Sequence, residues 1–133
     1  MTDWSAAAAP SLDDFAALAE AAFEALPPRF RGLAGDVEFR VTEFAEPQVL
    51  RSLDIEDPFE LTGLYHGVDI GARASMGPAP EAAMIFLYRR PILDEWAERG
   101  DVTLGELISH VLVHEIGHHF GLSDDDIDAI EAG

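Results

Sequence analysis

Apolar residues recur at helical spacing near the N-terminus and predict an amphipathic helix over residues 11–26. Ser11 and Asp14 have the spacing of a capping box at its first turn, and the Pro27-Pro28 pair ends it. The apolar stripe of this helix consists of Phe15, Leu18, Ala19, Ala22, Phe23 and Leu26. We expect the helix to cover a sheet and to carry no chemistry.

Three later stretches have the patterns of β-strands. Residues 37–41 alternate between apolar and polar side chains, which predicts a strand with one face in solvent. Residues 61–70 form a second predicted strand, and Gly63 and Gly67 within it indicate a bulge or the close approach of another backbone. Residues 82–88 are a continuous apolar run, which is typical of a strand that is buried on both faces.

The connecting segments are marked by proline and glycine. Residues 45–60 and residues 71–80 both contain prolines and are expected to be loops. Pro91 suits the first turn of a short helix that continues to Arg99 and stops at Gly100.

The last long helix begins at a second capping box, formed by Thr103 and Glu106. It is apolar almost all round, so we expect it to be buried. Gly121 suits the left-handed position just past its end, and Ser123 can cap a final short helix. These elements predict an α+β fold in a single domain that spans residues 1–133.

Composition and charge narrow the possible functions. The chain has 133 residues, of which 48% are hydrophobic, enough for one packed core. The net charge of −18 argues against nucleic acid and against anionic membranes as partners. There is no cysteine, so disulfides are excluded. We see neither a signal peptide nor an apolar run of membrane-spanning length, and we therefore expect a cytoplasmic protein.

The candidate chemistry lies in the last long helix, where His114, Glu115 and His118 form the pattern H-E-x-x-H. Residues four apart lie one above the other on the same face of a helix, so the two imidazoles can hold one zinc ion. Glu115 then lies beside the same site as a base. Two core histidines and a surface glutamate would give the same letters, but the helical setting favours the metal site.

These residues resemble the zincin metallopeptidases. His114, Glu115 and His118, followed by Gly121 and Asp124, are similar to the extended metzincin-type motif, with Asp in place of the usual third His. The chain is similar to the minimal, metzincin-like family of small bacterial zinc metallopeptidases, and residues 63–67 also resemble that family's central strand. The resemblance implies a small three- or four-stranded mixed sheet packed on a buried metal-binding helix. It also implies an N-terminal covering helix and a short C-terminal helix.

The resemblance implies a zinc-dependent peptidase. Zinc would be held by His114, His118 and Asp124, and Glu115 would act as general base on a zinc-activated water that hydrolyses a peptide bond. A peptide or protein substrate would pair with the strand edge at a stretch consisting of Gly63, Leu64 and Tyr65. His110 is better suited to support a ligand than to bind the metal, and Tyr65 and Tyr88 are the only phenols that could assist.

The third ligand has a rival interpretation. Asp124 lies beyond Gly121, which lets the chain leave the helix and return, whereas His119 points about 100° away from His118. Asp124 could instead be one of several acids in the first turn of the next helix.

Two other functions stay open at this point. Metzincins carry a methionine after the third ligand, but here Met1, Met76 and Met84 all precede Asp124. A degenerate zincin that binds a peptide or protein with little hydrolysis is therefore one alternative. The other is a structural metal site, in which His119 or a second Asp would fill the fourth position.

Overall fold

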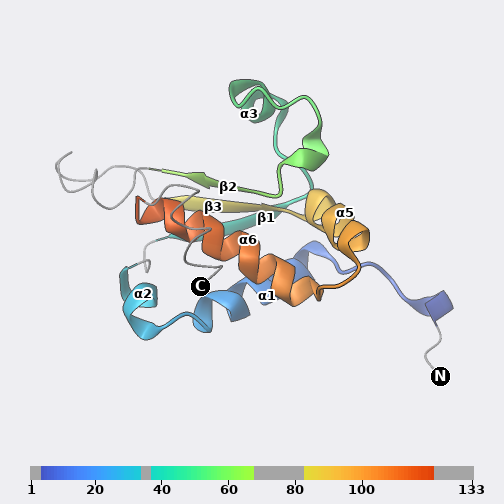
Figure 1. Ribbon diagram of the computed structural model, residues 1–133, viewed down its shortest axis with the longest axis horizontal. Helices are drawn as coiled ribbons and strands as arrows, with labels where there is room; N and C mark the ends of the chain where they lie inside the picture. Colours follow the sequence, from blue (N-terminus) through green and yellow to red (C-terminus); the bar gives the residue numbers. More distant parts are fainter. Residues whose placement is uncertain (1–3, 34–36, 68–82, 122–133) are drawn as a thin grey trace.

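The computed structural model describes residues 4–33, 37–67 and 83–121 (Figure 1). Three predictions lie outside these residues: the final helix that begins at Ser123, the role of Asp124, and the loop at residues 71–80. The helices are α1 (Leu12–Glu24), α2 (Pro28–Leu33), α3 (Pro47–Ser52), α5 (Arg89–Arg99) and α6 (Leu104–His119). The strands are β1 (Glu38–Thr42), β2 (Gly63–His66) and β3 (Met84–Tyr88), and two 3-10 turns are η1 (Trp4–Ala6) and η2 (Pro58–Glu60).

The three strands form one mixed sheet in the order β1-β3-β2. β1 runs parallel to β3, and β2 runs antiparallel to it. The continuous apolar sequence of β3 fits its surroundings, because Ile85 and Leu87 pack in the main core on one face and Phe86 and Tyr88 pack in a second cluster on the other. The mixed sheet, together with its helices, confirms the α+β class.

The two faces of the sheet differ in what covers them. Ile85 and Leu87 of β3 are fully buried on the inner face, in a core that they share with α1 and α6. Figure 1 shows these two helices along one side of the sheet, with α3 beyond the other side. The outer face holds a smaller cluster, in which Tyr88 packs with Leu50 of α3.

Both predicted capping boxes are confirmed. Ser11 accepts a hydrogen bond from the Asp14 N–H at 3.1 Å, and the Asp14 carboxylate accepts one from the Ser11 N–H at 2.8 Å. Thr103 and Glu106 make the same reciprocal pair at the start of α6. Gly121 follows the C-cap of α6 with a φ of 82°, the left-handed conformation expected of it.

The prediction of a loop over residues 45–60 was wrong, because this segment contains α3 and η2. Pro47 occupies the first turn of α3, where its missing N–H costs nothing. The short helix is stabilised by tertiary contact, since Leu50 is buried against the sheet. α5 also begins at Arg89, two residues before the predicted start at Pro91. In the described part of the chain, no helix is both long and apolar enough to cross a membrane.

Candidate active site

His114 and His118 lie one turn apart on α6, and both side chains are half-buried. Their ring centroids are 5.0 Å apart and the ring planes meet at 80°. α6 is buried on the side that faces α1 and the sheet, whereas the strip with the two histidines also carries the exposed His110. The helix is therefore less completely buried than its apolar sequence predicted, and the motif lies on its more open side.

Glu115 lies at the border between this strip and the sheet. Its side chain is only 8% exposed and lies against β2 at Gly63. A Cβ atom at Gly63 would be 2.6 Å from Cγ1 of Val111 and 3.4 Å from Cγ of Glu115. A side chain at this position would collide with α6, so glycine lets β2 lie against side chains of that helix, where the sequence indicated a bulge or an approaching backbone.

A small cleft of about 210 Å³ opens beside His114 and Glu115. Its other lining residues are Thr62, Glu95, Arg99, His110 and Val111. Arg99 and Glu95 form an ion pair at 3.2 Å on α5. The cleft thus brings the motif together with the residue that precedes β2 and with the C-terminal half of α5.

The main chain of β2 has a defined orientation at the sheet edge. The Tyr88 N–H donates to the Thr62 carbonyl at 2.9 Å, and the antiparallel register continues from there. Because main-chain groups alternate in direction along such a pair, Leu64 faces β3 while Gly63 and Tyr65 face away from the sheet. Among the described residues, no strand pairs with this outer edge. The main-chain groups of Gly63 and Tyr65 are therefore directed to the side of β2 away from β3.

Leu64 does not share this orientation. Its main chain is directed towards β3, and its side chain packs in the outer cluster with Tyr88. In the predicted substrate stretch, the main chains of Gly63 and Tyr65 are therefore directed away from β3, and the main chain of Leu64 between them is directed towards it. The exposed His66 lies on the outer side, in a hollow that is also lined by Leu64.

Tyr65 is joined to α6 by a contact that the sequence did not reveal. Its hydroxyl is 2.8 Å from Nδ1 of His119, and the two rings meet edge to face at 5.5 Å. His119 is completely buried. The only signal in the sequence is the 100° turn between His118 and His119, which directs one towards the open strip and the other towards the sheet.

Tyr88 lies on the outer face of the sheet but senses the charge at the site. Burial, together with the negative charges of Glu115 and Glu46, raises the pKa of its phenol to about 12. Tyr88 thus stays protonated at neutral pH. Neither Tyr88 nor Tyr65 lines the small cleft beside His114.

The residues present fit a zinc ion in their donor chemistry. Two imidazoles on one helix face with a carboxylate beside them are the donor types and spacing that zinc takes. Within residues 4–33, 37–67 and 83–121, no third His, Asp or Glu completes a metal-binding group with them. Asp124, the predicted third ligand, is outside these residues.

The fold and the site together define a class: a small mixed sheet whose edge strand lies against a helix with the H-E-x-x-H pattern. The chain belongs to the zincin-like metallopeptidase family, whose sequence model matches residues 34–133. The match includes the whole sheet, α6 and Asp124, but not α1. No protein of curated function matches the chain.

Proposed function

We propose that this protein is a zinc-dependent peptidase with His114, His118 and Asp124 as ligands and Glu115 as general base. The observation that carries the proposal is the position of the two imidazoles, one helical turn apart on α6, with Glu115 beside them and against β2. Zinc in such a site supplies a Lewis acid and a water of lowered pKa, which is the chemistry that amide hydrolysis needs.

Glu115 has the position of a proton carrier. It follows His114 on the helix and lines the same cleft, so its carboxylate can accept a proton from a water beside the histidines. The same carboxyl group can then pass that proton to the leaving amine. Its contact with Gly63 restricts the side chain to the space between α6 and β2.

The edge of β2 supports an extended peptide as the substrate. Gly63 directs its main-chain N–H and C=O away from β3, where an added strand could pair with them. Such pairing recognises the backbone of a peptide and tolerates many side chains. It would hold the peptide along β2, beside the cleft that contains His114 and Glu115.

Asp124 remains our proposal for the third ligand. His119, its rival, is buried and bonds to Tyr65, which engages it in the contact between α6 and β2. Asp124→Ala should weaken zinc binding by at least about tenfold, the lower limit of what the loss of a supporting residue costs. Asp125→Ala is the matched control and should bind zinc as the wild type does.

The decisive experiment compares Glu115→Gln with the wild type on unstructured fluorogenic peptides. Glutamine keeps the shape and removes the base, so turnover should fall by about two to four decades while zinc content is unchanged. Equal cleavage by both proteins would refute the mechanism.

A second candidate function is a peptide-binding module with little hydrolysis. The place of β2 at the edge of the described sheet favours it, because pairing of a peptide with this strand needs no metal chemistry. Peptide binding without cleavage by either protein would identify this function.

A further inference from the structure

The opposite edge of the sheet, formed by β1, is also open among the described residues. The Glu38 N–H donates to the Ala83 carbonyl at 2.9 Å, so Glu38 and Arg40 direct their main chains to β3. By the alternation of the ladder, Phe39 and Val41 direct theirs outward. An exposed row of this kind is a template on which another strand can pair.

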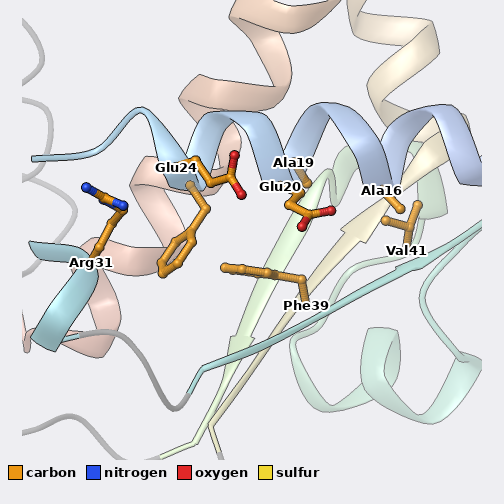
Figure 2. Close-up of a pocket in the computed structure, with 8 residues that line it drawn as sticks. Ala16, Ala19, Glu20, Glu24, Arg31, Phe39 and Val41 are labelled. Carbon is orange, nitrogen blue, oxygen red and sulfur yellow. The ribbon is translucent and has the colours of Figure 1, made fainter. Parts of the chain in front are cut away.

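A hollow of about 570 Å³ lies directly beside this edge, between α1, α2 and β1 (Figure 2). The side chains of Phe39 and Val41 point into it from β1, and Ala16 lines it from α1. Phe39 meets Phe23 edge to face at 5.1 Å, which gives the hollow an aromatic wall. A strand added to β1 would therefore place every second side chain in this hollow.

The rim of the hollow is acidic. Glu20 and Glu24 lie along it on α1, and both are exposed. Arg31 is the one cation among its lining residues, and its Nε donates to the Leu26 carbonyl at 3.1 Å. With a net charge of −18 on the whole chain, this surface selects against acidic segments and favours basic ones.

We infer that the β1 edge binds an extended peptide segment with an apolar residue and an Arg or Lys two positions apart. The main chain of the segment pairs with Phe39 and Val41. Its apolar side chain packs on Phe39, and the aliphatic stem of its basic residue follows the hollow to bring the cation to Glu20 and Glu24. Apolar contact, cation contact and strand pairing thus act on one ligand.

This surface is separate from the proposed catalytic site. β1 and β2 are opposite edges of the sheet, with β3 between them. None of the residues that line the hollow lines the cleft beside His114. The inference therefore stands or falls independently of peptidase activity.

The test is binding of the peptide Thr-Val-Thr-Arg-Thr-Val-amide, with fluorescein coupled to its N-terminus, to the full-length Glu115→Gln variant, which should not cleave it. A peptide with norleucine in place of Arg should bind at least about threefold more weakly, as expected for one ion pair in partial contact with solvent. Glu20→Gln combined with Glu24→Gln should remove this difference between the two peptides. The matched control, Glu56→Gln with Glu60→Gln, changes two exposed acids elsewhere by the same charge and should preserve it.

Two further measurements test the strand pairing. Methylation of alternate peptide nitrogens should weaken binding only in the set that faces β1, because the other set points away from the sheet. Ala16→Phe fills the hollow from an exposed position on α1 and should weaken binding of both peptides by about tenfold or more. The folded state of each variant is checked by circular dichroism.

Equal binding of the Arg and norleucine peptides to the wild-type rim would overturn the inference, as would equal effects of methylation at both sets of nitrogens. Analytical ultracentrifugation at the protein concentrations of the binding experiments tests whether the protein self-associates. If the protein self-associates and Phe39→Cys, in a chain without other cysteines, forms a disulfide-linked dimer, the occupant of this edge is a second copy and the peptide proposal is wrong.

Discussion

The two edges of the sheet offer the same main-chain groups but border different helices. At the β2 edge, Gly63 and Tyr65 face outward, and α6 passes so close that Glu115 contacts the strand. At the β1 edge, Phe39 and Val41 face outward beside α1, whose nearest polar side chains are glutamates. Strand pairing is possible at both, so the neighbouring helix decides what each edge can do. In the described part of the chain, the β2 edge borders the histidines and the glutamate on which the proposed peptidase depends, and the β1 edge borders an apolar hollow with an acidic rim.

The largest difference between the edges should be in zinc binding. The wild type should hold about one zinc per chain, and His114→Ala with His118→Ala should weaken binding by at least about a hundredfold, because both imidazole ligands are lost. His66→Ala, an exposed histidine on β2, is the control and should leave zinc content unchanged. Elemental analysis after dialysis measures this. If the double variant retains as much zinc as the wild type, zinc is bound by residues other than His114 and His118.

The next difference concerns substrate pairing at β2. In a cleaved or bound peptide, methylation of the amide nitrogens that face Gly63 and Tyr65 should raise KM by up to about tenfold for each lost hydrogen bond. The intervening nitrogens should tolerate the change, because they point away from β2. Arg40→Glu on β1 should not alter this pattern. A uniform effect along the peptide would mean that the substrate does not pair as a strand.

The sequence predicted the elements whose signals are local. The capping boxes at Ser11 and Thr103 depend on residues three apart, and the apolar run of β3 depends on neighbours in the chain. The sequence could not predict α3, because its six residues are stabilised by the burial of Leu50 against the sheet.

The same limit applies to the candidate site. The proximity of the two imidazoles followed from their spacing of one helical turn. A glycine within a strand indicated a special position at Gly63, but not that side chains of α6 would lie against it. The orientation of Leu64 could not follow, because it depends on which residue of β3 bonds to Thr62. The contact between Tyr65 and His119 joins residues 54 positions apart, and no local pattern indicates it.

Gly63→Ala tests how closely the β2 edge lies against its helix. The new methyl group would be 2.6 Å from Cγ1 of Val111, and we expect a loss of about 1–3 kcal/mol in the free energy of unfolding. Val111→Ala should recover part of this loss in a double-mutant cycle. Gly105→Ala is the matched control, because its methyl group would meet only Cδ2 of Leu18 at 3.9 Å. That change should be neutral or stabilising by up to about 1 kcal/mol, since alanine favours the helix.

Tyr88 can report the charge at the β2 edge. In a Tyr65→Phe background it is the last tyrosine, so absorbance near 295 nm follows its ionisation alone. The pKa should be about 12 in the folded protein, against the ordinary value of 10. Glu115→Gln should lower it, because the Glu115 charge is one cause of the shift, whereas Glu38→Gln on β1 should not. If the pKa of Tyr88 is unchanged in Glu115→Gln, the charge of Glu115 does not influence Tyr88.

The same shift makes stability depend on alkaline pH. The unfolded chain loses the phenol proton near pH 10, while the folded chain retains it until about pH 12, so the unfolded state binds fewer protons in this window. Stability should therefore fall as the pH rises from 10 to 12, by on the order of 2 kcal/mol. Tyr88→Phe should remove this contribution to the pH dependence of the free energy of unfolding. If that free energy falls between pH 10 and 12 as steeply in Tyr88→Phe as in the wild type, the prediction is wrong.

The smallest effect should come from the hydroxyl that joins the β2 edge to α6. Tyr65→Phe removes the hydrogen bond to Nδ1 of His119 and keeps the ring, so the free energy of unfolding at neutral pH should fall by about 1 kcal/mol. Tyr88→Phe is the matched control, since it removes a hydroxyl from the outer face of the same sheet.

The hydrogen bond between Tyr65 and His119 can also position β2 for a substrate. In that case Tyr65→Phe should raise KM more than it lowers kcat, because pairing of the substrate with β2 would be weakened while His114 and Glu115 stay in place. Peptide binding at the β1 edge should be unchanged in the same variant, because β3 separates the two edges. A variant that binds less peptide at both edges would mean that Tyr65 supports the whole sheet and that the two edges are not independent.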